Sequence, residues 1–85
     1  MDNQDIYYNE MPFTAISDKY MMRNYEEKMI LIKSTIGFTH LFRLLKLEED
    51  CVIGIMYTGR EFETVKIPLM NIHCFYVSRY DYNNK

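Results

Sequence analysis

Arg60 is the first residue in this sequence whose type and setting could bind a ligand. It follows Thr58 and Gly59 in a segment that has the pattern of a β-hairpin turn between two strands. A guanidinium exposed at such a tip can hold a phosphate or carboxylate through two parallel hydrogen bonds. The alternative is a solvated turn residue that pairs with the neighbouring Glu61, because turns are routinely polar.

The last strand, expected over residues 72–82, supplies a second group of candidates. Tyr76, Tyr80 and Tyr82 would share one face of that strand, with Arg79 on the other face. Aromatic rings beside Arg suit stacked nucleobases and their phosphates. The same tyrosines also suit a subunit interface, where Tyr is enriched. The two uses are compatible if the ligand binds between subunits.

His40 and Arg43 form a third group, with the ring of Phe42 between them in the sequence. Gly37 lies in a loop just before them and would let backbone N–H groups approach an anion. The loop lacks the spaced glycines and the final Gly-Lys-Ser/Thr of a P-loop, so nucleotide hydrolysis is not expected.

The cysteines and histidines of the sequence give four possible metal ligands, which are Cys51, Cys74, His40 and His73. Structural zinc sites use closely paired ligands, whereas adjacent residues such as His73 and Cys74 point to opposite faces of a strand. Buried, reduced thiols explain both cysteines better. We therefore expect no metal, no cofactor and no catalytic site, and a protein that is not an enzyme.

The composition favours a folded binding protein. The chain has 85 residues, of which 48% are hydrophobic and 15% aromatic, with a net charge of −2. This charge argues against a protein that coats DNA, because such affinity comes from many Lys and Arg contacts to phosphates. Residues 1–27 hold two basic and six acidic residues, whereas residues 28–85 hold eight basic and six acidic residues. A compact ligand with a few negative charges is therefore compatible with the strand region.

Two cysteines without a hydrophobic leader fit a reducing compartment, so we expect a cytoplasmic protein, in the host cytoplasm if the protein is viral. No apolar run approaches the roughly 20 residues of a membrane helix. A chain of this length buries only about 60–65% of its unfolded surface. Association with itself or with other partners is therefore expected.

The predicted fold is mainly β (α+β): a small five-stranded antiparallel sheet or barrel, preceded by an N-terminal arm and one short helix. Residues 1–16 form the arm, whose apolar residues are expected to dock on the domain or on a neighbouring chain, and residues 17–85 form a single domain. Ser17 is predicted to cap the helix. Strands are predicted over 28–34, 39–48, 51–58, 61–68 and 72–82, and the strand over 51–58 is expected to be buried and central. An amphipathic helix is the alternative for 39–48.

An arm and a short helix, then about five strands with the segment IPLMNI before the last one, resemble the Sm-like small β-barrel proteins over roughly residues 17–79. This resemblance implies a small-barrel shape and self-association in a ring or a smaller oligomer. The signature glycines of that family are not matched, since Gly54 lies within the third predicted strand, and no functional residue is transferred. The Asn-, Tyr-, Met- and Ile-rich composition looks like that of small phage accessory proteins.

Two functions follow as hypotheses. The first is a non-enzymatic homo-oligomer that sequesters a small anionic ligand of nucleotide type at a subunit interface, with short RNA as a related ligand. Its ligand-binding residues would be Arg60, Thr58, Arg79, Tyr76, Tyr80, Arg43 and His40. The second is a phage-type inhibitor or adaptor that docks its acidic arm and its Tyr/Met-rich surface on a host protein.

Overall fold

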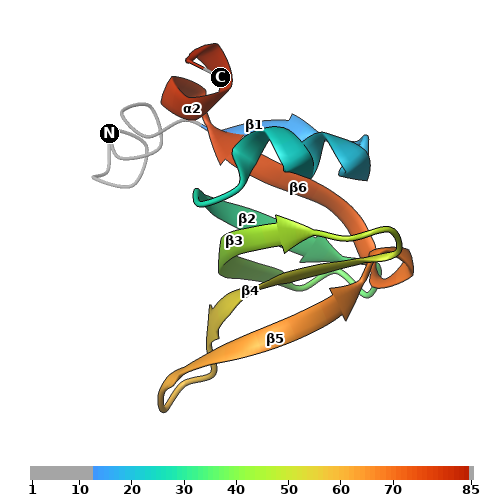
Figure 1. The fold of residues 1–85 in the computed structure, drawn as a ribbon, viewed down its shortest axis with the longest axis vertical. Helices are drawn as coiled ribbons and strands as arrows, with labels where there is room; N and C mark the ends of the chain where they lie inside the picture. The colour runs from blue at the N-terminus through green and yellow to red at the C-terminus, as the bar shows by residue number, and fades with distance from the viewer. Residues whose placement is uncertain (1–12, 85) are drawn as a thin grey trace, which may run out of the picture.

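The computed structural model describes residues 13–84, which form one six-stranded antiparallel sheet with short helical segments (Figure 1). The order of the strands is β1-β6-β2-β3-β4-β5, so β1 and β5 are the two edges. The edges do not pair, and the sheet is open instead of closing into a barrel. The strands are β1 (Phe13–Ile16), β2 (Met29–Ser34), β3 (Thr39–Leu47), β4 (Cys51–Tyr57), β5 (Phe62–Pro68) and β6 (Ile72–Ser78).

The sixth strand is β1, and its presence corrects the prediction of five strands. Phe13 to Ile16 pair with Ser78 to Phe75 of β6, although residues 1–16 were expected to be an arm without a strand. A run of four residues after Pro12 is too short to show an alternating pattern. It becomes a strand because β6 offers an unpaired edge. The predictions for residues 1–12 lie outside the described residues.

The predicted short helix is the 3-10 segment η1 (Lys19–Tyr25). Its cap is Asp18, one residue later than expected, and the Asp18 side chain accepts a hydrogen bond from the Tyr20 N–H at 3.0 Å. Met22 and Tyr25 are both buried on the side that faces the sheet. The Lys19 ammonium donates to the Leu69 carbonyl at 2.7 Å, which ties η1 to the second 3-10 segment, η2 (Leu69–Asn71).

The strand prediction for the region after Gly37 is confirmed, because β3 is extended from Thr39 to Leu47. Its residues alternate between two environments: Phe42 and Leu44 are fully buried, whereas Leu41 and Arg43 are exposed. A β-bulge follows Leu44, where the pairing with β4 skips one residue. The predicted strand over 28–34 is confirmed as β2.

The β4–β5 hairpin is also confirmed. Gly59 has a φ of 97°, in the region that favours glycine, and the Thr58 N–H donates to the Glu61 carbonyl at 3.0 Å across the turn. Strand β4 is apolar on both faces, as expected, but it lies next to the edge strand and not at the centre of the sheet. Gly54 within it leaves room for the Phe42 ring of β3, which a β-carbon at this position would meet.

The last strand ends four residues earlier than predicted. β6 stops at Ser78, whose Oγ accepts a hydrogen bond from the Asp81 N–H at 3.0 Å, and residues 79–83 form the short helix α2 (Arg79–Asn83). A serine followed three residues later by an acid is a helix-start pattern. The prediction that Tyr76, Tyr80 and Tyr82 share one strand face is therefore wrong, because Tyr80 and Tyr82 belong to this helix.

The sheet has two unlike faces, which we call the inner and the outer face. The inner face packs against η1 and forms the core, where Ile30, Phe42 and Phe75 are each 0% exposed. The Tyr25 ring meets the Phe75 ring edge-on at 6.1 Å between centroids. In the part of the chain that the structure describes, no helical segment packs over the outer face. That difference positions the candidate site.

Candidate functional site

The outer face carries large apolar side chains that remain open to solvent. They alternate with the core residues of the same strands, so the pleat itself directs them away from η1. Exposed fractions on this face are 47% for Met29, 57% for Leu41, 55% for Tyr57 and 73% for Phe62. Phe13 of β1 lies on the same face, since it pairs with Ser78, two residues from Tyr76, which in turn pairs with Leu31.

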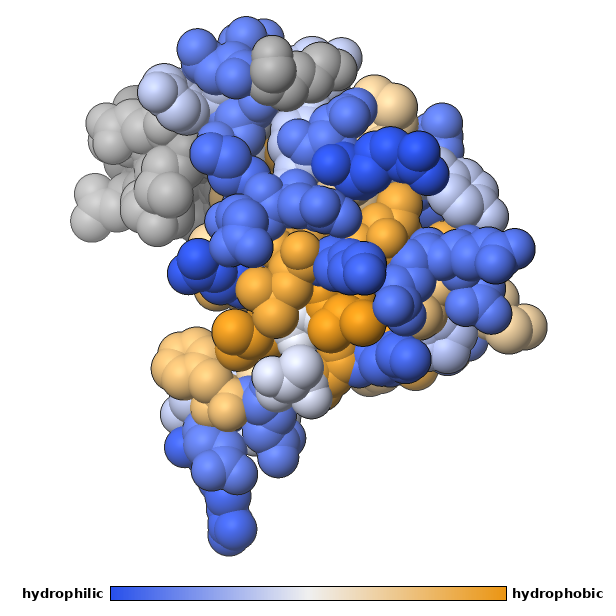
Figure 2. Space-filling view, in the orientation of Figure 1, coloured by the Kyte–Doolittle hydropathy of each residue, from blue (hydrophilic) through white to orange (hydrophobic). Residues whose placement is uncertain are grey.

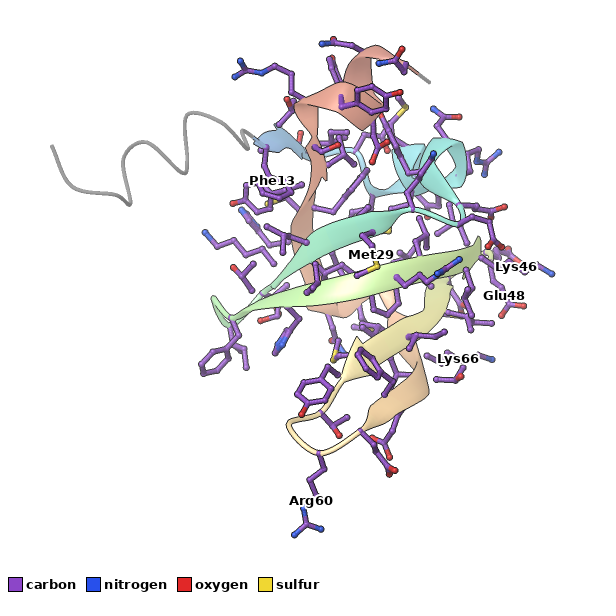
Figure 3. The ribbon with its side chains drawn as sticks, turned by 90° about the vertical axis from the view of Figure 1, so that its left-hand side faces the viewer. Phe13, Met29, Lys46, Glu48, Arg60 and Lys66 are labelled. Carbon is purple, nitrogen blue, oxygen red and sulfur yellow. The ribbon has the colours of Figure 1, made fainter. Side chains whose placement is uncertain are left out.

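A cavity of about 460 Å³ opens on the outer face, across β2 to β5. Met29 lies in the middle of this face and Arg60 at the far tip of the hairpin (Figure 3). The volume falls within the roughly 300–1,000 Å³ of small-ligand sites and is also enough for one or two aromatic side chains of a partner. The lining residues are Met29, Leu41, Arg43, Ile55, Tyr57 and Phe62.

An aromatic pair forms the side of the cavity toward the hairpin. Tyr57 and Phe62 are directly opposite each other on β4 and β5, and their ring centroids are 5.1 Å apart with an interplanar angle of 54°. Cross-strand aromatic pairs of this kind stabilise a hairpin. Their exposed ring faces also offer a surface on which an apolar or aromatic group can pack.

The charged strand residues on the outer face are all basic. Register places them there as Lys33, Arg43, Lys46 and Lys66, whereas the acidic strand residue in the described chain, Glu63, pairs with Met56 on the inner face. Two acids reach these bases from turns: Glu27 lies 3.6 Å from Arg43, and Glu48 lies 3.7 Å from Lys66. Both are exposed ion pairs, which contribute little to stability, so another anion can readily displace the acid from each base.

One of the residues predicted to bind a ligand, Arg43, lines this cavity. Thr58 and Arg60 lie in the hairpin turn, where the Thr58 hydroxyl donates to the Glu61 carbonyl at 3.2 Å. The Arg60 side chain points away from the body of the protein (Figure 3). His40 is exposed on β3, with its ring 6.4 Å from that of Phe38.

The remaining predicted residues lie near the other edge of the sheet. Tyr76 is half-buried on β6, Tyr80 is 74% exposed on α2, and Arg79 is the first residue of that helix. The hairpin tip and α2 lie at opposite ends of the long axis (Figure 1). Within one chain, Arg60 and the tyrosines therefore do not form a single site.

Both thiols are buried and free, as predicted. The Cys51 thiol donates to a Glu48 carboxylate oxygen at 3.4 Å, and its burial, together with this hydrogen bond, raises the pKa of Cys51. A hydrogen bond with Cys74 and the charge of that thiol, then burial, raise the pKa of Tyr76. Within residues 13–84, no group of three or more His, Cys, Asp or Glu side chains is arranged to hold a metal ion. No helix in this part of the chain is long and apolar enough to cross a membrane.

The sequence analysis did not predict five of the six lining residues, namely Met29, Leu41, Ile55, Tyr57 and Phe62. The signal was present, because β4 is apolar at both odd and even positions. That pattern predicts burial on both faces, and it does not distinguish a covered face from an exposed one. Apolar residues also reach the surface in the middle of the view in Figure 2, above the hydrophilic hairpin tip.

Comparisons with protein-family models, with curated proteins and with solved structures each returned no match.

Proposed function

We propose that this protein is a non-enzymatic binding protein that docks a segment of a partner protein on its outer face. The segment would carry apolar side chains with acidic neighbours. The observation that supports this proposal is the row of exposed apolar residues on a face whose strand charges are basic. It corresponds to the adaptor or inhibitor hypothesis, with the sheet face as the contact surface.

Apolar exposure of this kind is unusual for a small monomer. Single exposed hydrophobic residues are normal on protein surfaces, but contiguous ones mark interaction sites. Met29, Leu41 and Phe62 come from three strands and line one cavity. A partner side chain that fills the cavity would therefore be desolvated on several sides, as interface hot spots are.

Charge determines the preferred partner chemistry. Arg43 lines the cavity, and its exposed pair with Glu27 leaves the guanidinium accessible to a competing carboxylate. Lys33 and Lys46 have no ion pair among residues 13–84. A segment with acidic residues beside its apolar anchors is steered to this face and held there.

A matched pair of surface variants tests the proposal. Leu41→Asp places a charge in the cavity, whereas Met70→Asp places one on η2, where the side chain is 80% exposed and outside the cavity. Wild type and both variants are tagged and crosslinked in cells, and captured proteins are identified and purified. Binding to each purified protein is then measured by calorimetry. We expect Leu41→Asp to lose at least tenfold in affinity for the true partner while Met70→Asp keeps it. Equal affinity in both variants would exclude the outer face as the site.

A small anionic ligand of nucleotide type, bound by a homo-oligomer, is the second candidate. The observation that favours it is the Tyr57–Phe62 ring pair in the same cavity as Arg43, since a base can stack on such rings beside a guanidinium. A panel of mono-, di- and cyclic nucleotides should then raise the melting temperature of wild type and of Arg60→Ala, but not of Arg43→Ala. Light scattering of the same samples measures the oligomeric state. No shift with any nucleotide would leave the protein partner as the better hypothesis.

A further inference from the structure

We infer that residues 1–12 of the same chain lie across the outer face and fill its cavity until a partner displaces them. Only the displacement rests on the proposed function, because occupancy by this segment is a separate statement about the chain. The observations that support it are the composition of the segment, the face on which it joins the sheet, and the distance to the cavity.

The composition of this segment matches the chemistry of the face. It contains three acidic residues and no Lys or Arg, whereas the outer-face strand charges are all basic. Its large apolar residues fit a cavity that is lined by apolar side chains except for Arg43. They include Ile6, Tyr7, Tyr8 and Met11. The segment thus has the features expected of the partner, on a chain that is already tethered.

The point of attachment is favourable. Residues 1–12 join the sheet at Phe13, whose side chain lies on the outer face at 41% exposure, on the same side as Met29 (Figure 3). In strand order, β1 is followed by β6, β2 and β3, so Phe13 and Arg43 are three strand spacings apart. Three spacings amount to about 14 Å.

The length of the segment covers this distance. Five residues separate Tyr7 from Phe13. An extended chain advances about 3.3 Å per residue, so six steps span about 20 Å. Tyr7 and Tyr8 can therefore reach the cavity between β3 and β4, and Asp5 can reach the vicinity of Arg43, without any change in the sheet.

The tether gives a weak contact a large effect. A short tether sets an effective concentration on the order of 1 mM, so a segment with an intrinsic affinity of about 0.1 mM would occupy the face about ten elevenths of the time. A partner would then bind about tenfold more weakly than to an uncovered face. The segment would act as a built-in competitor that selects for partners of higher affinity.

Methyl NMR on the full-length protein tests the occupancy. Met29 lies in the cavity, whereas the exposed Met70 on η2 lies outside it, so their labelled methyl groups serve as reporter and control. The variant Tyr7→Ser/Tyr8→Ser removes both rings from the segment and leaves residues 13–84 unchanged. We expect the Met29 methyl signal to move and the Met70 signal to stay. An unchanged Met29 signal would overturn the inference, whether or not a partner protein is ever found.

Three further measurements identify the source of the occupant and the effect on binding. Dilution of the wild-type protein from about 500 to about 20 μM leaves the Met29 signal in place if the segment binds within its own chain. A signal that moves toward that of the double variant on dilution indicates exchange between copies and overturns the intramolecular placement. A synthetic peptide of residues 1–12, added to the double variant, should restore the wild-type Met29 signal. A captured partner should bind the double variant about tenfold more tightly, and loss of that gain alone would reject only the displacement.

Discussion

The two faces of the sheet carry similar apolar residues, which are buried on the inner face and exposed on the outer face. On β3, Phe42 and Leu44 of the inner face are 0% exposed, while Leu41 between them on the outer face is 57% exposed. The difference comes from what covers each face: η1 brings Met22 and Tyr25 onto the inner one. Neighbouring apolar residues in one strand can thus serve folding and binding separately, and their spacing alone does not tell which residue does which.

This division has an energetic consequence. Apolar burial contributes about 25 cal/mol per Å² removed from water, so the inner face supplies most of the stability of this small domain. The outer residues contribute little until something covers them. They are held in place by a sheet that does not depend on them, which is a suitable arrangement for a preformed binding surface.

The largest contrast is expected between Leu44→Ala and Leu41→Ala. Leu44 is fully buried, so its truncation leaves a cavity and should lower the free energy of unfolding by about 2–5 kcal/mol. Leu41 is exposed in the described domain, so in the Tyr7→Ser/Tyr8→Ser background, where the outer face is uncovered, its truncation should change that free energy by less than about 0.5 kcal/mol. Urea titrations of both variants in that background measure the two values. Similar losses in both would show that Leu41 is packed within the folded domain itself.

Gly54→Ala is expected to have the next largest effect. A β-carbon at this position would meet the Phe42 ring and the Arg43 backbone carbonyl, which cannot both move without disturbing the β3–β4 pairing. Overpacking of this kind lowers stability by about 1–3 kcal/mol. Gly59→Ala is not a suitable control, because its φ of 97° strains any side chain. The matched control is Thr64→Ala on β5, whose side chain is exposed. Thermal unfolding should separate the two variants, and equal melting temperatures would contradict the close packing of Phe42 on Gly54.

Much of this fold could be predicted from alternation and turn residues. The predicted bounds of strands β2 to β5 agree with the observed ones to within one residue, because the apolar runs end near Gly37, Gly59 and Pro68. β1 was missed because four residues carry no usable period and depend on the free edge of β6. The end of β6 was missed because Arg79 to Tyr82 continue the alternation, although Ser78 and Asp81 carry the helix-start pattern.

The site was less predictable than the fold, for a physical reason. Arg60 and Tyr80 were predicted to bind a ligand because of their side-chain chemistry, but the hairpin tip and α2 that carry them lie at opposite ends of the molecule. Arg43 was the one predicted residue that lines the cavity. The aliphatic lining residues have no distinctive chemistry, and their role depends on which face η1 covers. That choice follows from tertiary packing and not from any local pattern.

Tyr25→Phe tests the covered face with a smaller expected change, of opposite sign. The Tyr25 ring is buried against Phe75, yet its hydroxyl has no hydrogen-bond partner among the described residues. A buried hydroxyl without a partner lowers stability by about 1–3 kcal/mol, so its removal should raise the free energy of unfolding, by about 1 kcal/mol if the site relaxes in part. Urea titration at pH 7 measures the change. A loss of stability would show that the hydroxyl is hydrogen-bonded to water.

The smallest expected effect is on the alkaline limit of stability, and it also depends on Tyr25. Burial, then the nearby Tyr82 and Asp81, raise the pKa of Tyr25 above its usual 10.0. The folded protein therefore keeps this proton at a pH where the unfolded chain has begun to release it. Below about pH 10 both states are protonated and the contribution to stability is complete; as the pH rises through and above 10, the unfolded state binds fewer protons and stability falls. In Tyr25→Phe that part of the decline should disappear, leaving the parts due to Cys51 and Tyr76, whose pKa values are also raised. Urea midpoints at pH 8, 10 and 11 give the two slopes. Equal slopes in both proteins would mean that the Tyr25 hydroxyl ionises as freely in the fold as in water, and would place it on the open side of the sheet instead of the covered one.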